Sequence, residues 1–365
     1  MEQRLLEILS AIQPPDAAAM DAARQRQDAL AKPPHSLGAL EDISVKLAGV
    51  TGRVVNAVDR RRLLVFAADN GVVDEGVSSC PRSVTLRQTE NLARGLTGAA
   101  VLARHFGSEL RVIDVGVAAQ VRAPGVVDRK IAFGTHNFTK GPAMTRDEAL
   151  SALQIGFDEA RQARADGVQI LGVGEMGIGN TTTASAVLSA LLKRPARETV
   201  SRGAGLTDVA FERKIAVIDD ALSRLKPDAS APVDVLCKVG GFDLAAMCGA
   251  FLGAAASRLP AVIDGFISAV AALCAYRLNP LCAGCLFPSH ASMERGYRLA
   301  MEAMGLEPIL SLNMRLGEGS GCPIAFEIIA AAERVIAEMG TFDEAGIDDG
   351  YLSDIRGNPR HMGEA

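Results

Sequence analysis

Short apolar runs alternate with longer helical patterns through most of the chain. The runs typical of strands are 63–68, 110–115, 168–173, 261–263, 285–287 and 309–312. Between most of them lie about ten or more residues with helical periodicity, and this alternation predicts βαβ units. Consecutive βαβ units place their strands parallel, so the pattern predicts an α/β fold with a mostly parallel sheet.

The amino-terminal segment has helical rather than strand periodicity. Residues 2–31 predict a helix that is interrupted at Pro14, with Asp16 as the N-cap of its second part. Residues 32–38 contain two prolines and a glycine and predict a loop. A short amphipathic helix is then expected to about Val50.

The longest apolar stretches are shorter than a membrane span. They cover residues 244–256 and 261–276, whereas a helix that spans a bilayer needs about 20 residues. Arg258 and Pro260 separate them, and Asp264 interrupts the second. We interpret them as buried helices and a strand. No signal peptide is apparent at the amino terminus, and we expect a cytoplasmic protein without a membrane partner.

Composition and charge exclude some classes of function. Hydrophobic residues make up 48% of the 365 residues, enough for a large core, and the net charge is −5. Aromatic residues make up 4% and Trp is absent, so neither a basic stripe nor stacking platforms for nucleic acid are expected. The seven cysteines are odd in number and most lie in apolar surroundings, which indicates reduced, buried thiols.

Polar or glycine-rich loops follow the predicted strands repeatedly. These loops are at 69–72, 116–117, 174–182, 264–265, 288–290 and 317–321. If the strands are parallel, all of these loops meet at one edge of the sheet, where ligands bind in open α/β folds. Their convergence is stronger evidence for a site than any single loop.

One carboxylate stands out among these loops. Glu318 lies in Arg315-Leu316-Gly317-Glu318-Gly319-Ser320-Gly321, after the apolar run 309–312 and before the helical run 323–336. The pattern predicts that Glu318 lies at the carboxyl end of a strand. Glycines bring the backbone close to a ligand, and a shielded carboxylate is a candidate general base. A helix-capping acid in a turn explains the local pattern equally well.

The segment Gly172-Val173-Gly174-Glu175-Met176-Gly177 matches G-x-G-x-x-G after a predicted strand. A dinucleotide site needs an acid at the end of the next strand, and Glu198 lies at that distance but not in a strand. The segment also lacks the Lys of a P-loop. It is better interpreted as a phosphate loop before a helix, with Glu175 on a ribose hydroxyl. The alternative is plain N-capping by 180–182.

Further glycine segments and polar groups have competing interpretations. The loop 201–208 with Lys214 is suited to a phosphate, although a linker with a solvated Lys is the simpler local interpretation. The turn 238–243 is either part of a site or a helix start capped by Asp243.

Three other patterns are better explained without a site. Cys282 and Cys285 have the spacing of half a zinc site, but no second Cys or His pair accompanies them, so no metal is expected. His290 lies beside serines without a nucleophile elbow, which argues against a hydrolase triad. The pair Asp219-Asp220 lies within a helical pattern and is better interpreted as part of a solvated face.

Taken together, the segments resemble the nicotinate-nucleotide–dimethylbenzimidazole phosphoribosyltransferase family. The matching segments lie between about residues 30 and 330 and occur in the same order as in the family. The resemblance rests on Lys32-Pro33, Ser36-Leu37-Gly38, Leu40-Glu41, Ala68-Asp69-Asn70-Gly71-Val72, Glu75-Gly76-Val77, Val84-Thr85, Gln88, Val112-Ile113-Asp114-Val115-Gly116, the Glu175 segment with Asn180-Thr181-Thr182, Lys238-Val239-Gly240-Gly241-Phe242-Asp243, Asp264-Gly265-Phe266, Pro288-Ser289-His290 and the Glu318 loop. A match of so many motifs in the same order is highly specific for this family.

The resemblance implies a reaction without a cofactor. The family moves ribose phosphate from nicotinate mononucleotide to 5,6-dimethylbenzimidazole, which gives nicotinate and the α-ribazole 5′-phosphate used for the lower ligand of cobalamin. By this resemblance Glu318 is the general base that takes a proton from one benzimidazole nitrogen while the other attacks C1′. A β donor and an α product fit one displacement with inversion. Nicotinate leaves as a neutral pyridine ring, which lowers the need for acid or metal.

The resemblance also implies the site, the fold and the assembly. Cys80, Pro81, Gln88, Met176 and Leu316 are expected in the base pocket, and Glu175, Gly177, Gly203, Lys214 and Ser292 at the ribose and phosphate. The implied fold is a doubly wound sheet with helices on both faces. A small helical domain would come from residues 1–50 and 331–365, around a catalytic domain of residues 51–330. A homodimer is expected, with the partner's amino-terminal segment at the site.

The sequence departs from the family pattern at several positions. His35 and Asn70 stand where Gly and His are usual, and Cys80 and Met176 stand where Ser and Leu are common. The last two belong to the expected base pocket. The departures leave the reaction class intact, but they open the acceptor to other benzimidazoles, purines or phenols. A protein that only hydrolyses the nucleotide, or one that binds it without catalysis, is the remaining alternative.

Overall fold

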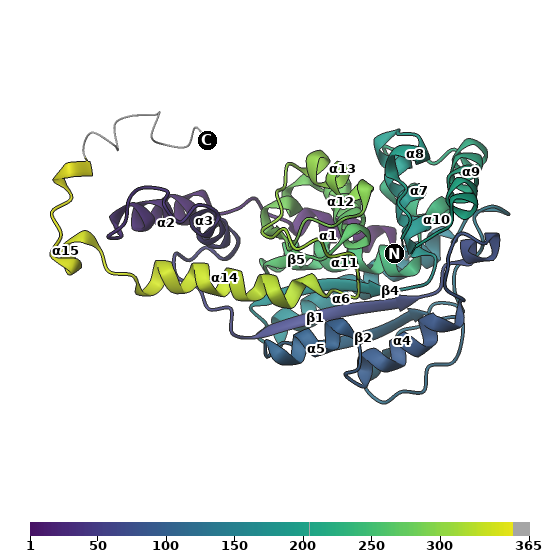
Figure 1. Cartoon of the computed structure of the whole chain (residues 1–365), viewed down its shortest axis with the longest axis horizontal. Coiled ribbons are helices and arrows are strands. Elements are labelled where there is room, and N and C mark those ends of the chain that lie inside the picture. The colour runs from purple at the N-terminus through teal and green to yellow at the C-terminus, as the bar shows by residue number, and fades with distance from the viewer. Residues whose placement is uncertain (204, 353–365) are drawn as a thin grey trace.

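The computed structural model describes residues 1–203 and 205–352, and its elements are labelled in Figure 1. The α-helices are α1 (Glu2–Ala11), α2 (Ala17–Ala29), α3 (Ala39–Thr51), α4 (Ser83–Ala93), α5 (Gly98–His105), α6 (Arg146–Ala165), α7 (Asn180–Leu192), α8 (Ala196–Thr199), α9 (Asp208–Leu225), α10 (Pro232–Val239), α11 (Phe242–Ala256), α12 (Phe266–Leu278), α13 (Arg295–Met304), α14 (Gly321–Glu338) and α15 (Phe342–Ala345). Short 3-10 helices lie at η1 (Gly71–Glu75), η2 (Pro280–Cys285) and η3 (Gly350–Leu352).

A parallel sheet forms the centre of the molecule, as predicted. Its strands are β1 (Arg61–Ala68), β2 (Glu109–Gly116), β3 (Val126–Asp128), β4 (Ile170–Met176), β5 (Ala261–Ile263) and β6 (Leu286–Pro288). They pair in the order β3-β2-β1-β4-β5-β6, and all five pairings are parallel. The order reverses its direction between β1 and β4. In open α/β sheets this switch point leaves a crevice at the carboxyl ends of the strands.

The strands differ from the sequence prediction in two places. Residues 309–312 do not form a strand, because only Leu310 makes a single bridge, to His290. Glu318 therefore follows an irregular segment instead of a strand of its own. The short edge strand β3 was missed, because three residues are too few to show a periodicity.

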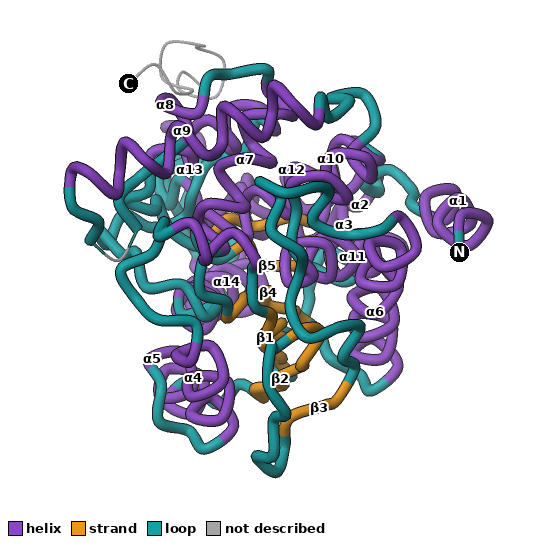
Figure 2. Tube along the Cα trace, turned by 90° about the vertical axis from the view of Figure 1, so that its right-hand side faces the viewer, coloured by secondary structure: helices purple, strands orange, loops and turns teal. Residues whose placement is uncertain are grey.

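Helices cover both faces of the sheet. On one face, α4 and α5 pack against β2, and α14 packs against β1, β4 and β5. On the other, α11 lies across β1, β2 and β4, and α6 packs on α11 from outside (Figure 2). The doubly wound α/β arrangement is thus confirmed.

The helix pair α6 and α11 approaches closely enough to require glycine. A Cβ on Gly156 would lie 1.7 Å from the carbonyl oxygen of Ala246, and one on Gly249 would lie 1.9 Å from that of Leu153. Both helices are thus locked backbone to backbone. Buried apolar side chains line α11 and α12, as the long apolar stretches predicted. Within the described residues, no helix is long and apolar enough to cross a membrane.

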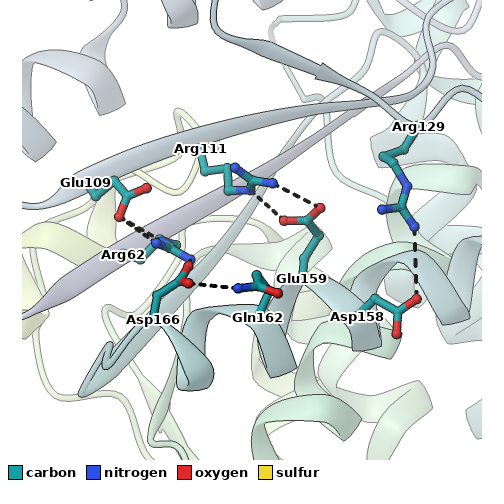
Figure 3. Close-up of polar contacts among 8 residues, drawn as sticks. All are labelled: Arg62, Glu109, Arg111, Arg129, Asp158, Glu159, Gln162 and Asp166. Atoms are coloured by element: carbon teal, nitrogen blue, oxygen red, sulfur yellow. Dashed lines mark hydrogen bonds and ion pairs between the residues drawn. The ribbon is translucent and has the colours of Figure 1, made fainter.

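A charged network joins α6 to the amino ends of the central strands (Figure 3). Arg62 at the start of β1 pairs with Glu109 of β2 and with Asp166 at the end of α6, each at 2.8 Å. Arg111 pairs with Glu159 at 2.5 Å. The Arg62 side chain is only 8% exposed, so two carboxylates satisfy a guanidinium that is largely desolvated. This network lies at the edge of the sheet opposite to the ligand-binding edge.

The predicted helices near the amino terminus are present. The carboxylate of Asp16 caps α2 by accepting the N–H of Ala19 at 3.0 Å, as predicted. Both α2 and α3 pack on the far part of α14, with a small core of Ala19, Ala23, Val45, Ala48 and Ile336 separate from the main one. The division at residues 50 and 330 stays a prediction, and residues 353–365 lie outside the described part.

Candidate active site

A cavity of about 300 Å³ lies over the carboxyl ends of β4 and β5, next to the switch point of the sheet. Its walls come from the loop before α4, the end of β4, the start of α7, the residues Arg202, Gly203 and Leu206, α9 and the loop before α14. Sequence segments more than 200 residues apart therefore meet in one hollow. The predicted convergence of strand-end loops accounts for this position.

Most of the predicted site residues border this cavity. The predicted residues that line it are Cys80, Gln88, Glu175, Met176, Gly177, Gly203, Lys214, Ser292, Leu316 and Glu318. Pro81 follows Cys80 in the chain but is not among the lining residues. The structure thus gathers these side chains around one space, while the role of each stays a prediction.

The Glu318 side chain lines the cavity, and each of its two carboxylate oxygens accepts a hydrogen bond. Its Oε1 accepts a hydrogen bond from Gln88 Nε2 at 3.1 Å, and its Oε2 accepts the backbone N–H of Ala99 at 3.3 Å. Ala99 lies in the first turn of α5, where a negative charge is favoured. Glu318 is 5% exposed and has φ +62°, between Gly317 at +86° and Gly319 at +81°. The carboxylate is therefore partly shielded and fixed in direction.

The Glu318 loop lies directly against β4. A Cβ on Gly174 would lie 2.4 Å from the nitrogen of Gly319 and 2.8 Å from the carbonyl carbon of Glu318. Gly317 likewise leaves room for Glu175, because a Cβ there would lie 2.6 Å from Glu175 Oε1. The glycine spacing of both segments is thus a packing requirement that brings the two carboxylates together.

Substitution of Gly174 by Ala is expected to displace the Glu318 loop. The added methyl group cannot be accommodated against backbone, so we expect a loss of about 1–3 kcal/mol in the free energy of unfolding and a fall in activity. Gly141 is the matched control, since nothing lies within 4 Å of a Cβ there. Chemical denaturation and turnover of both variants measure the effect. Equal behaviour of the two variants would contradict the close approach.

Two buried carboxylates, Glu175 and Asp264, line the cavity, and a third, Asp243, lies behind them in hydrogen-bond contact with Asn180. Burial raises the pKa of Glu175 to about 8, and repulsion from Asp243 adds to this, while a hydrogen bond from Asn180 opposes it. Burial likewise raises the pKa of Asp243 to about 6 and that of Asp264 to about 7. Asn180 donates to Glu175 and, at 3.1 Å, to Asp243. At neutral pH Glu175 is therefore a protonated acid that can donate a hydrogen bond.

The raised pKa of Glu175 predicts an unusual pH dependence of stability. In the unfolded chain this group titrates near 4.5, and in the folded chain near 8, so the folded state binds more protons between these values. Its stabilising contribution is present below pH about 4.5 and is lost as the pH rises through about 8. We expect Glu175→Gln to be more stable than the wild type at pH 8, by about 1–3 kcal/mol, with the difference vanishing at pH 5. Urea unfolding at both pH values measures this, and a difference independent of pH would contradict it.

Lys214 is a buried lysine among the lining residues of the cavity. Its Nζ donates to Thr181 Oγ1 at 2.9 Å and to the carbonyl of Ser201 at 3.3 Å. The residue is 1% exposed, and burial lowers its pKa to about 8, while nearby Glu294 opposes the shift. Gly203 lies beside Thr181, which is in the first turn of α7. A buried ammonium group, a helix start and a glycine turn form a site suited to a phosphate.

Part of the cavity lining is apolar, and we refer to it as the apolar wall. Met176, Leu316, Val77 and Val84 line it, together with the thiol of Cys80. Leu316 is 59% exposed, and Cys80 is partly exposed. Leu316 lies two residues before Glu318, so a flat apolar ring that packs on Leu316 would have its polar edge near the Glu318 carboxylate.

Some lining residues were missed from the sequence, and some candidates lie elsewhere. The lining also includes Asp264, Asn180, Arg202 and Glu294, which were not among the predicted site residues. In the sequence, only their position after a strand or near a glycine loop could have indicated that they belong to the site. His290 also lines it, but its Nδ1 lies 2.9 Å from Ser289 Oγ, and burial lowers its pKa.

Two of the three patterns that the sequence argued against, the cysteine pair and the acid pair, do not contribute to this cavity. Asp219, Asp220, Cys282 and Cys285 are absent from its lining, and Asp219 accepts the N–H of Ala196 instead. Among the described residues, no group of three or more His, Cys, Asp or Glu side chains could hold a metal ion.

Comparison with known proteins places the chain among related sequences. A family model described as phosphoribosyltransferase matches residues 12–347. The nicotinate-nucleotide–dimethylbenzimidazole phosphoribosyltransferase of Clostridium perfringens is 48% identical over 352 residues, 96% of this chain and 98% of that protein. The protein of the same name from Acetivibrio thermocellus is 50% identical over 90% of this chain and 94% of that protein. The crystal structure of CobT from Thermus thermophilus has a TM-score of 0.88 at 41% identity, covering 91% of this chain and 100% of that chain.

Proposed function

The chain belongs to the nicotinate-nucleotide–dimethylbenzimidazole phosphoribosyltransferase family, and on this premise we propose that Glu318 is its general base. The protein transfers the 5-phosphoribosyl group of nicotinate mononucleotide to 5,6-dimethylbenzimidazole, with nicotinate and α-ribazole 5′-phosphate as products. One observation carries the proposal. The Glu318 carboxylate is buried at the cavity wall and accepts hydrogen bonds from the side chain of Gln88 and the backbone of Ala99.

The polarity of the cavity supports one orientation of the substrates. The donor phosphate lies at Lys214 and Gly203, and the ribose lies near Glu175, Gly177 and Ser292. The acceptor ring lies against Met176 and Leu316, within reach of Glu318. With the phosphate at Lys214 and the acceptor ring at the apolar wall, C1′ of the ribose is expected between them.

The chemistry then follows from this placement. Glu318 accepts the proton of one benzimidazole nitrogen, and the electron pair of the other nitrogen attacks C1′ from the face opposite to nicotinate. The bond from C1′ to the pyridinium nitrogen breaks, and its electrons neutralise the ring as it leaves. One in-line displacement therefore converts a β donor into an α product, with proton transfer as the catalytic contribution of the protein.

The direct test is a turnover assay with nicotinate mononucleotide and dimethylbenzimidazole, with the products resolved by chromatography. We expect equimolar nicotinate and α-ribazole 5′-phosphate. Nicotinate with free ribose phosphate would indicate hydrolysis, and binding of the nucleotide without any product would indicate a non-catalytic protein. Either outcome would overturn the proposed transfer.

The range of acceptors is a separate part of the proposal. Cys80 and Met176 line the apolar wall, and both are among the positions where this chain departs from the common residues. Acceptance of other benzimidazoles, purines or phenols is expected. A competition assay with a mixture of these bases measures the range, and exclusive formation of the dimethylbenzimidazole product would contradict it.

The proposal also covers the oligomeric state and the cellular location of the protein. The enzyme acts as a cytoplasmic homodimer in which the partner's amino-terminal segment adjoins the cavity. Light scattering coupled to size-exclusion chromatography tests the dimer. A monomeric mass together with full activity would contradict a contribution from the partner.

A further inference from the structure

Asp264 has a buried carboxylate that the proposed chemistry does not use. It directly follows β5 and is 2% exposed. Its Oδ2 accepts the N–H of Gly319 at 3.1 Å, and its Oδ1 accepts the N–H of Gly321 at 2.7 Å. Gly319 follows Glu318 in the chain, and Gly321 begins α14. Both hydrogen bonds therefore hold the backbone immediately after Glu318.

The loop needs such a restraint because its conformation is unfavourable. Glu318 has φ +62°, and a residue with a Cβ pays roughly 1–2 kcal/mol in the left-handed region. Strained residues persist only where the surrounding structure holds them. The bonds from Gln88 and Ala99 restrain the side chain of Glu318, whereas Asp264 restrains its backbone.

Asp264 is itself anchored to the strands on both sides of β5. Its N–H donates to Ser268 Oγ at 3.1 Å, and that hydroxyl donates to the carbonyl of Val173 in β4 at 2.8 Å. Its carbonyl accepts from Ser289 Oγ, just beyond β6, at 3.1 Å. The restraint on the Glu318 loop is thus connected to the rigid centre of the sheet.

We propose that Asp264 is a positioning residue, whose two backbone hydrogen bonds orient the Glu318 carboxylate for proton transfer. The inference rests on the proposed role of Glu318 as general base. It assigns to Asp264 no contact with the reacting atoms. The positioning acts on the chemical step and not on the binding of the nucleotide, because the Asp264 carboxylate bonds the Glu318 loop, whereas Lys214 bonds Thr181 and Ser201.

The first test is Asp264→Asn. The carboxamide of Asn has only one acceptor oxygen, so its NH₂ group must face the N–H of either Gly319 or Gly321. The hydrogen bond to that N–H is lost, and the loop is no longer restrained there. Small displacements of a catalytic group are costly, so we expect kcat to fall about 10- to 100-fold. The dissociation constant of nicotinate mononucleotide, measured by calorimetry, should change by less than about threefold.

Asp114→Asn is the matched control. Asp114 is also 2% exposed and lies near the end of β2; its Oδ1 accepts the N–H groups of Gly116 and Val117, at 3.1 and 2.9 Å, and its Oδ2 pairs with Lys130 at 2.7 Å. Asn at this position removes a buried charge and an ion pair but can keep both backbone bonds. It does not line the cavity. We expect this variant to lower Tm while kcat of the folded enzyme stays within about threefold of the wild type. An equal loss of kcat in both variants would mean that Asp264 has only a structural role.

A double-mutant cycle separates this inference from the proposed function. If Asp264 acts through Glu318, adding Asp264→Asn to Glu318→Gln should lower the residual kcat by less than about threefold. A full further loss of 10-fold or more, or a single variant with unchanged kcat, would overturn the positioning role. Full activity of Glu318→Gln alone would instead overturn the general base, whatever Asp264 does.

A second variant covers the case in which Asp264→Asn does not fold. Ser268→Ala removes the hydroxyl that links the backbone of Asp264 to β4 and leaves the carboxylate in place. We expect a smaller loss of kcat, of about three- to tenfold, that likewise disappears in the Glu318→Gln background. Persistence of that loss in the double variant would overturn the inference.

Discussion

Replacement of Glu318 by Gln lowers the turnover of ribose-phosphate transfer by about 10²- to 10⁴-fold and leaves nucleotide binding near the wild-type level. Gln has nearly the same volume and retains one acceptor oxygen for Gln88, but its NH₂ group then faces the N–H of Ala99, so the side chain loses one of its two hydrogen bonds. The backbone hydrogen bonds to Asp264 still hold the loop. An amide cannot take a proton at neutral pH, and the chemical step therefore loses its base. Turnover assays and calorimetry with nicotinate mononucleotide separate these two effects.

The control for this substitution is Glu333→Gln. Glu333 is a buried glutamate in α14, 2% exposed, that accepts the N–H of Asn56 and does not line the cavity. Removal of its carboxylate should leave turnover within about threefold of the wild type. Full activity of Glu318→Gln would remove Glu318 as the base, and weakened nucleotide binding would place it at the donor instead.

Replacement of Lys214 by Met has the second largest expected effect, on the affinity for the donor. Loss of a charge-assisted contact to phosphate costs about 1.5–3 kcal/mol, so we expect the dissociation constant of nicotinate mononucleotide to rise about 10- to 100-fold. The melting temperature should change little, because loss of the buried charge offsets the loss of hydrogen bonds to Thr181 and Ser201.

The pH dependence gives an independent check of this assignment. Burial lowers the pKa of Lys214 to about 8, so the free enzyme carries this charge below that value and loses it above. Donor affinity should therefore weaken as the pH rises through about 8, and this step should be absent in Lys214→Met. Lys238→Met, at a lysine outside the cavity lining that pairs with Asp234, is the matched control. Equal affinities of the Lys214 variant and the wild type would contradict a phosphate site there.

Some of these features were readable from local sequence. Asp16 caps α2 because the first turn of a helix leaves N–H groups that a short acidic side chain satisfies. The alternation of apolar runs with helical patterns predicted the parallel sheet, since each strand needs helices on its faces. The strand at 309–312 failed because its pairing stays short: Ile309 and Leu310 donate to the carbonyls of Pro288 and Ser289 at the end of β6, and only a single bridge, from Leu310 to His290, results.

The site shows the same division between local and distant information. The sequence by itself determined the α/β class, the glycine-rich surroundings of Glu318 and the position of polar loops after strands, because these depend on periodicity and on residue type within short segments. Only the tertiary structure decided that Gln88, Ala99 and Asp264 hold the Glu318 loop, and that Glu175 is buried among other acids. These contacts join residues far apart in the chain, and their energies depend on burial and distance, which no local pattern specifies.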